Sequence, residues 1–397
     1  MLPAFFINKC SVEVRSCCGF FVCLLYKAIS KLSPYQIFLI NMDFGDFIIS
    51  PRNFKTETWQ IGSRITKDIK EDSIVLLFVS DYRGVGGEAE VQDFTAVRKE
   101  FYKLSQLDFE IPIVDLGDLV SGKSVQDTHY ILQEVLSACH YKRAVPVIIG
   151  GSNDFAYSLF SALNFHQKSL NFTQISNMIS LKQGEEINEH TFLSKIFGAK
   201  NFSIKNYHHL GYQKHLNEID SVRLIKEVEF DIVRLAEMMN STEKTEPFFR
   251  RADLVTVNCD AIESFSEPFS MNPQVNGLNR REICAYMKEI GLSEHLKSVG
   301  IFNYNIYSEN QLNHQLLAQM LWYLAEGINI QRSHPKERHY EIFYVLVDDR
   351  QYTFKRDTFS NLWYFGEDED IENCIPCSRK DFDDAKKGWL NARLTKI

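Results

Sequence analysis

The feature that most constrains the fold is a regular alternation, from residue 74 onward, of apolar runs with amphipathic segments. The run SIVLLFVSDYRG is typical of a buried strand that ends in a polar, glycine-bearing loop, whereas FTAVRKEFYKLSQL carries apolar residues at helical spacing. Strands that alternate with helices indicate a parallel sheet covered on both faces, with functional loops at the carboxyl ends of the strands. The expected strands cover 73–84, 111–119, 144–151, 252–262 and 296–306, and the expected helices cover 94–107, 125–142, 155–163, 279–292 and 315–328.

The pattern changes at two points of the chain. After about residue 331, HYEIFYVLV, QYTFKR and LWYFG resemble short strands, and the acidic stretch GEDEDIEN follows them. We therefore expect an α/β domain over 42–330 and a β-rich segment over 331–397 that packs on it. Residues 1–41 form an N-terminal extension without this patterning.

The extension contains one apolar run, CCGFFVCLLY at 17–26. Its ten or so residues are too few to span a bilayer, which needs about 20. Lys9 and Arg15 precede it, as in a signal peptide, yet no small-x-small cleavage pattern follows. Because all patterned sequence begins after Met42, we favour a translation start at Met42, which would make residues 1–41 a start-site artefact.

Composition and charge limit the class of protein. The chain is 45% hydrophobic and 24% charged, as in ordinary globular proteins, and its formal net charge is −8. No dense cluster of Lys and Arg forms a basic face, which argues against nucleic acid as a partner. The nine cysteines are unevenly spaced, so we expect free thiols, a reducing compartment and a cytoplasmic location.

The stretch VIIGGSNDFAY, residues 147–157, has the layout of a strand that runs into a functional loop. A phosphate cradle would need a spaced set such as GxGxxG or GxxxxGK[ST], and GGSND has neither, so a nucleotide site is not expected. RGVGGEAE at 83–90 also lacks such a fingerprint and is interpreted as a flexible loop. We expect Asp154 to cap the helix that begins at Phe155.

A second polar pair stands in VTVNCDAIESFSEP, where Asn258 and Asp260 are two residues apart. Side chains at this spacing point the same way at the end of a strand. Two carboxylates there would form a strong site for a divalent cation. An asparagine is neutral and therefore a much poorer ligand.

In order and spacing, GGSND, TVNCDAIESFSEP and GLNRREICAYMKEIGLSEHLKSVGIFNYN resemble the landmarks of the ureohydrolase superfamily of arginases, agmatinases and formimidoylglutamases, whose DxHxD motif should fall in ISNMISLKQ. The family pattern is GGDH[ST], DxHxD, SxDxD and Gly-Leu-x-x-[RK]-E. The chain is most similar to the bacterial formimidoylglutamase-like branch, which has GGSHD and a C-terminal NC…PCS patch, here NCIPCS. The resemblance covers about residues 42–397 and implies a three-layer α/β/α fold.

The resemblance also implies that a metal centre has been lost. Family members use six ligands to hold two Mn²⁺ ions that activate a hydroxide for hydrolysis. Those six positions fall here on Asn153, Ser176, Met178, Ser180, Asn258 and Asp260. Only Asp260 keeps a ligand's chemistry, and one carboxylate cannot neutralise two dications. The acidic residue that holds the substrate's guanidinium in the family falls near Asn303.

Other candidate residues are weaker. His208 and His209 follow a probable strand, but adjacent side chains rarely face one ion, so surface or packing roles are favoured. Cys374 and Cys377 form half of a zinc or redox motif without a second pair, and free thiols in a packed tail are favoured. Cys259 should point away from Asp260, which disfavours a nucleophile.

We therefore predict a catalytically silent relative with a binding or structural role and no cofactor. The alternative is an active hydrolase of linear amidines, such as formiminoglutamate, arginine or agmatine, with a manganese site remodelled around Asp260 and ligands such as His208, Asp154 or Glu263. A small-molecule sensor that keeps the old pocket is a third hypothesis. A protein partner, a small molecule or a second copy of the chain are all candidate partners, and no membrane span is expected.

Overall fold

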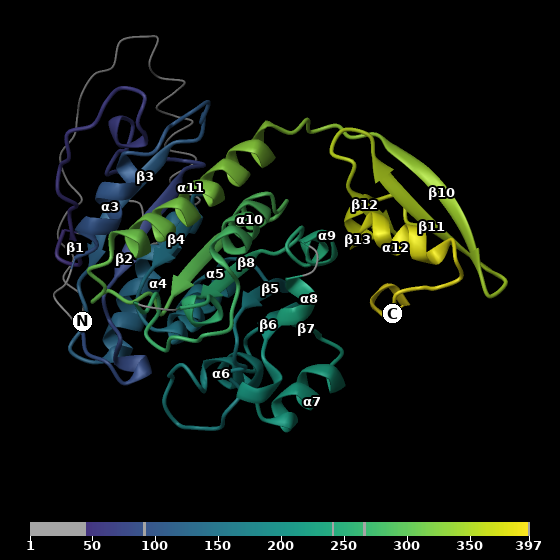
Figure 1. Ribbon diagram of the computed structural model, residues 1–397, viewed down its shortest axis with the longest axis horizontal. Coiled ribbons are helices and arrows are strands. Elements are labelled where there is room, and N and C mark those ends of the chain that lie inside the picture. The colour runs from purple at the N-terminus through teal and green to yellow at the C-terminus, as the bar shows by residue number, and fades with distance from the viewer. Residues whose placement is uncertain (1–44, 90–92, 240–241, 265–266, 396–397) are drawn as a thin grey trace, which may run out of the picture. The chain divides into compact units, whose positions relative to one another are not determined.

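The computed structural model describes residues 45–89, 93–239, 242–264 and 267–395, so the prediction for residues 1–41 lies outside the described residues. A mostly parallel sheet runs through the main part of the chain in the order β1-β3-β2-β4-β9-β8-β5-β6-β7, with only β1 antiparallel to its neighbour (Figure 1). Its strands are β1 Ile48–Ile49, β2 Ile74–Val79, β3 Ile113–Leu119, β4 Val145–Ile149, β5 Leu170–Ile175, β6 Ile204–Tyr212, β7 Asp231–Arg234, β8 Leu254–Asn258 and β9 Ser298–Phe302. The predicted α/β fold is confirmed.

Helices cover both faces of this sheet and form two separate apolar cores. Residues of α3, α10 and α11 pack with one face, and residues of α4, α5, α6 and α7 pack with the other. The helices are α3 Thr95–Tyr102, α4 Val125–Tyr141, α5 Ala156–His166, α6 Phe192–Gly198, α7 Ile219–Glu227, α8 Leu235–Met238, α9 Thr242–Thr245, α10 Arg280–Gly291, α11 Gln311–Ser333 and α12 Arg379–Ala385. None of these helices is long and apolar enough to cross a membrane.

The strands with continuous apolar runs are those that the sequence predicts. All six residues of β2, IVLLFV, and all five of β4, VPVII, are buried, as expected for strands with both faces covered. The strands β5, β6 and β7 were not predicted, and His208 and His209 lie inside β6 rather than after a strand. Polar residues interrupt the apolar runs of β5 and β6, and their side chains form hydrogen bonds within the protein. Thr173 Oγ1 donates to the Phe248 carbonyl at 2.7 Å, and Tyr207 Oη donates to Gln174 Oε1 at 2.9 Å.

The C-terminal segment forms a four-stranded antiparallel sheet, as the β-rich pattern predicts (Figure 1). Its strands are β10 Tyr340–Val347, β11 Arg350–Asp357, β12 Trp363–Phe365 and β13 Ile375–Cys377. Phe354, Trp363 and Cys377 belong to a separate small apolar core, with Phe382 of α12 packed against it. Ser378 begins α12 with a capping box to Asp381.

One buried guanidinium joins this sheet to the preceding part of the chain. Arg250, only 2% exposed, forms an ion pair with Glu246. It also donates to the carbonyl oxygens of Trp363 and Cys377, the latter at 3.1 Å. A charged donor that satisfies two backbone carbonyls and one carboxylate holds the C-terminal sheet more firmly than neutral hydrogen bonds would.

The substitution Arg250→Met should lower the free energy of unfolding by about 3–5 kcal/mol, because it leaves Glu246 and two carbonyl groups without their donor. Chemical denaturation of the full chain measures this change. Arg280→Met, at an exposed position of α10, is the control and should change stability by less than about 0.5 kcal/mol. Equal stability of the two variants would contradict the anchoring role.

Candidate functional site

The polar loops singled out by the sequence meet at one edge of the sheet. The strands β4, β9, β8 and β5 are consecutive neighbours, and all four are parallel. Their carboxyl ends therefore lie side by side, which is where α/β proteins place functional residues. Asn153 follows β4, Asn303 follows β9 and Ser176 follows β5. Asn258 is the last residue of β8, and Asp260 comes two residues later.

The loop after β4 depends on its two glycines. Gly150 and Gly151 have φ values of 84° and 72°, a backbone conformation that glycine adopts without strain. The turn brings the backbone N–H of Asn153 within 2.9 Å of Asn303 Oδ1, to which it donates. The glycines thus connect the ends of β4 and β9.

The prediction that Asp154 caps a helix is wrong. A short 3₁₀ turn, Asn153–Phe155, precedes α5, and no side chain caps either helix start. This turn directs the fully buried Asp154 carboxylate toward α4, where its Oδ2 lies 3.0 Å from Nε2 of the equally buried His129. Asp154 therefore joins two helices instead of satisfying the amides of α5.

Asn303 is the centre of the polar cluster at this edge. Its Nδ2 donates to Asp260 Oδ2 at 2.6 Å and lies 3.3 Å from Glu189 Oε2, while its Oδ1 accepts from Asn153. The residue is fully buried and has a φ of 58°, a left-handed conformation that asparagine tolerates better than most residues. One amide therefore links three loops.

Glu189 is a member of this cluster that sequence reasoning missed. It lies just before α6, and its backbone N–H donates to the Gly84 carbonyl at 3.2 Å. Asn272 Nδ2 also donates to Glu189 Oε2 at 3.2 Å. Burial and the nearby Asp260 charge raise the pKa of the Glu189 carboxyl to about 7. No motif marks the stretch EEINEH that contains it, so only the fold reveals this contact.

Asp260 is satisfied entirely by amide groups. Besides Asn303, the backbone N–H and the side-chain Nδ2 of Asn272 approach its two oxygens at 3.1 and 3.3 Å. Burial raises the pKa of Asp260, and the hydrogen bonds from Asn303 and Asn272 oppose that shift. The side chain is therefore a hydrogen-bonded carboxyl group in the protein interior.

The other positions that the resemblance assigns to metal ligands have local roles or neutral chemistry. Asn258 Oδ1 accepts from the Asp260 N–H at 2.9 Å, and Ser176 Oγ donates to the Met178 carbonyl at 2.9 Å. Ser180 lies in the same loop after β5, and no hydrogen bond joins it or Met178 to Asp260. These four positions carry amide, hydroxyl and thioether groups.

The donor set at the six positions does not fit a binuclear manganese centre. It contains one carboxylate, whereas hard dications require several charged oxygen ligands or imidazoles. Among the described residues, no group of three or more His, Cys, Asp and Glu side chains is placed to hold a metal ion.

The remaining candidates lie elsewhere. His208 Nδ1 lies 3.1 Å from Asp231 Oδ2 between β6 and β7, the last two strands at one side of the sheet, and no hydrogen bond connects it to the Asn303 cluster. Cys374 and Cys377 are buried free thiols, as predicted. Cys259 is buried in the core, and burial raises the pKa of its thiol, which disfavours a nucleophilic thiolate.

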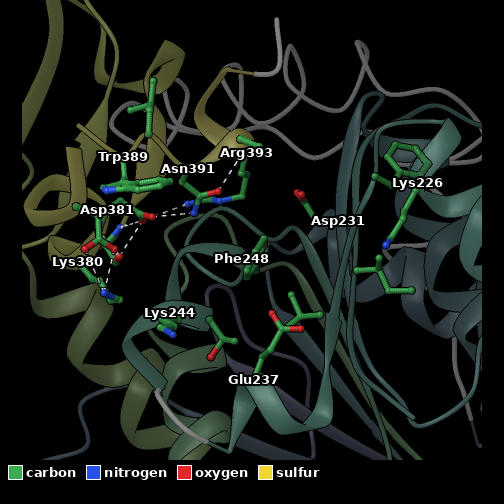
Figure 2. Close-up of a pocket in the computed structure, with 18 residues that line it drawn as sticks. Lys226, Asp231, Glu237, Lys244, Phe248, Lys380, Asp381, Trp389, Asn391 and Arg393 are labelled. Carbon is green, nitrogen blue, oxygen red and sulfur yellow. Dashed lines mark hydrogen bonds and ion pairs between the residues drawn. The ribbon is translucent and has the colours of Figure 1, made fainter. Parts of the chain in front are cut away.

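A separate pocket of about 560 Å³ lies between β7, the segment around α9 and the C-terminal residues (Figure 2). Two of its charged side chains form ion pairs: Lys380 lies 2.9 Å from Asp384, and Arg393 lies 3.8 Å from Asp381. None of the six metal-ligand positions lines this pocket. It is therefore distinct from the candidate site.

Comparison with known proteins agrees with the fold. The model of the arginase family matches residues 91–325, and the chain therefore belongs to the arginase family. No curated protein matches the sequence.

Solved structures of this fold include several amidine hydrolases. Formiminoglutamase of Trypanosoma cruzi with Mn²⁺ is 15% identical, with a TM-score of 0.58 over 66% of this chain and 95% of that one. Formimidoylglutamase of Bacillus subtilis is 14% identical, with a TM-score of 0.60 over 77% of this chain and 99% of that one. Proclavaminate amidino hydrolase of Streptomyces clavuligerus is 15% identical, with a TM-score of 0.56 over 71% and 100%. At these identities the likeness shows the fold alone.

Asn303→Ala should lower the free energy of unfolding by about 2–4 kcal/mol, because it removes the donor to a buried carboxylate and places alanine in a left-handed conformation. Chemical denaturation measures the loss. Asn361→Ala is the matched control, because Asn361 is exposed and has nearly the same φ of 59°. It isolates the backbone strain, for which we expect about 1 kcal/mol. Equal losses would show that the hydrogen bonds of Asn303 contribute nothing.

Glu189→Gln should remove a pH-dependent loss of stability. In the folded protein the raised pKa makes the Glu189 carboxyl hold its proton more tightly than in the unfolded chain. Its stabilising contribution is therefore complete below about pH 4.5 and is lost as the pH rises through about 7. Relative to the variant, the wild type should lose about 1–3 kcal/mol between about pH 5 and pH 8.

Denaturation curves at both pH values measure this difference. The control Glu185→Gln, at an exposed position of the same loop, should follow the wild type. A wild type and a Glu189→Gln variant with parallel pH profiles would contradict the prediction.

Proposed function

We propose that this arginase-family protein is catalytically silent and uses the family's scaffold in a binding or structural role. The observation that carries the proposal is the state of Asp260, the single carboxylate at the six positions. Its oxygens are already engaged by Asn303 and Asn272, and the side chain is buried. A metal ion would have to displace these donors and would find only neutral side chains at the other five positions.

The position expected to bind the substrate's guanidinium also supports a catalytically silent protein. Where the family is expected to hold a guanidinium with an acidic side chain, Asn303 presents an amide, and both ends of that amide are occupied within the protein. Gly84 packs against Asp154 so closely that an added Cβ would lie 1.9 Å from Asp154 Oδ1. There is therefore no room for a larger side chain than glycine beside Asp154.

One observation favours the alternative, an active hydrolase of linear amidines with a remodelled site. Glu189 supplies a second carboxylate close to Asp260, bridged to it by the amides of Asn303 and Asn272. The similar structures named as formiminoglutamase and formimidoylglutamase make formiminoglutamate the first substrate to test, followed by arginine and agmatine. A small-molecule sensor that retains the pocket without the chemistry is the third candidate.

The purified full chain, dialysed against manganese, should retain fewer than about 0.1 equivalents of the metal and should show no turnover of the three amidines. Elemental analysis and ammonia or urea release measure the two quantities. About two equivalents of manganese with turnover would refute the proposal, and about one equivalent with turnover that is lost in Glu189→Gln would establish the remodelled hydrolase.

A positive control keeps a negative result meaningful. The same scaffold with Asn153→His, Ser176→Asp, Met178→His, Ser180→Asp and Asn258→Asp should retain manganese, because the carboxylates supply negative charge and the imidazoles supply nitrogen ligands that the present side chains lack. Thermal-shift measurements with the three amidines separate a sensor from a protein-binding scaffold. A concentration-dependent rise in melting temperature without turnover would support the sensor.

A further inference from the structure

The outer strand of the C-terminal sheet has an exposed apolar face. Three alternate residues of β10, Ile342, Tyr344 and Leu346, are 53%, 65% and 68% exposed. Their spacing places them on one face of the strand, while Val345 and Val347 are buried on the other face. On β11 the same face is covered, since Thr353 and Lys355, opposite Tyr344 and Ile342, are each only 6% exposed. The uncovered apolar surface is therefore confined to the outermost strand.

The same strand has an open backbone edge. Within the described part of the chain, β10 pairs with β11 alone, over eight residues. Asp348 and Asp349, both with positive φ, form a two-residue turn after Val347, which pairs with Arg350. In such hairpins the residues that flank the turn form the first hydrogen-bonded pair. The alternation of an antiparallel ladder then directs the amide and carbonyl groups of Ile342, Tyr344 and Leu346 to the open edge.

The strand lacks the features that usually protect an edge. Between Tyr340 and Val347 there is no proline and no lysine, and the register with β11 runs without a bulge. Its one charged residue, Glu341, is paired with Arg356 of β11 at 2.5 Å. An eight-residue edge with unpaired backbone groups and three exposed apolar side chains is a template for another strand.

We propose that β10 of a second copy of this chain occupies this edge, antiparallel to the first, in a two-fold dimer centred on Tyr344. In that register Tyr344 faces Tyr344 of the other copy, and Ile342 faces Leu346, so the apolar side chains form one continuous row. At the strand ends, His339 of one copy faces the acidic turn residue Asp349 of the other, so an imidazole N–H stands opposite a carboxylate acceptor. Two four-stranded sheets thereby join into one eight-stranded sheet.

The strand's match to itself is the reason for proposing a second copy of this chain as the partner. A two-fold interface requires that one surface match itself, and the strand is apolar at its centre, with the exposed His339 at one end and two exposed aspartates at the other. The interface involves a single strand edge, which is small compared with stable protein–protein interfaces. We expect a reversible dimer with a dissociation constant of about 1–100 µM.

Sedimentation of the full chain over this concentration range tests the proposal, with Tyr344→Lys as the disrupting variant. The two-fold register would place two lysines opposite each other, so the dissociation constant should rise at least about tenfold. Trp389→Lys is the matched control, because Trp389 is 76% exposed in the C-terminal segment and is not part of β10. Its dissociation constant should stay within about twofold of the wild type.

Amide hydrogen exchange of residues 340–347 provides a second measurement that does not depend on a variant. Exchange should slow with increasing concentration of the wild type and should remain fast in Tyr344→Lys. A wild type that is monomeric at about 100 µM would overturn the proposal. So would a dimer that persists unchanged in both Tyr344→Lys and a second variant, Leu346→Lys.

Discussion

Because the central strands are buried on both faces, the polar side chains at their carboxyl ends must satisfy one another. Asp260 shows the consequence most clearly. A carboxyl group with no access to water requires donors, and the amides of Asn303 and Asn272 supply them. The loops that follow β4, β8 and β9 are joined by this arrangement, since Asn303 also accepts from the backbone N–H of Asn153.

The scaffold and the candidate site rest on different residues. The glycines after β4 set a backbone turn, and Asn279 with Glu282 forms a capping box that begins α10. These motif residues serve folding, and they are present. The side chains that would carry charge are neutral at five positions, and folding does not need their charge. A family member can therefore keep its architecture after its site has changed.

How well each part of the structure could be predicted depends on how far apart in the sequence the contacting residues lie. The strands β2 and β4 could be predicted because their apolar runs are a local signal, whereas the mixed residues of β5 and β6 become a strand pattern only when their partners are known. The role of Glu189 could not be predicted, because its contact with Asn303 spans 114 residues of sequence. Asp154 was misassigned for a similar reason: its partner His129 lies on another helix.

The left-handed backbone at Asn303 limits which routes of evolution remain open to this chain. Such a conformation accepts asparagine, aspartate or glycine, so an aspartate at this position would be conformationally easy. Electrostatically it would be costly, because Glu189 and Asp260 already lie on the same amide nitrogen. A third carboxylate would need a bound proton or a cation beside it, whereas the neutral amide of Asn303 needs neither.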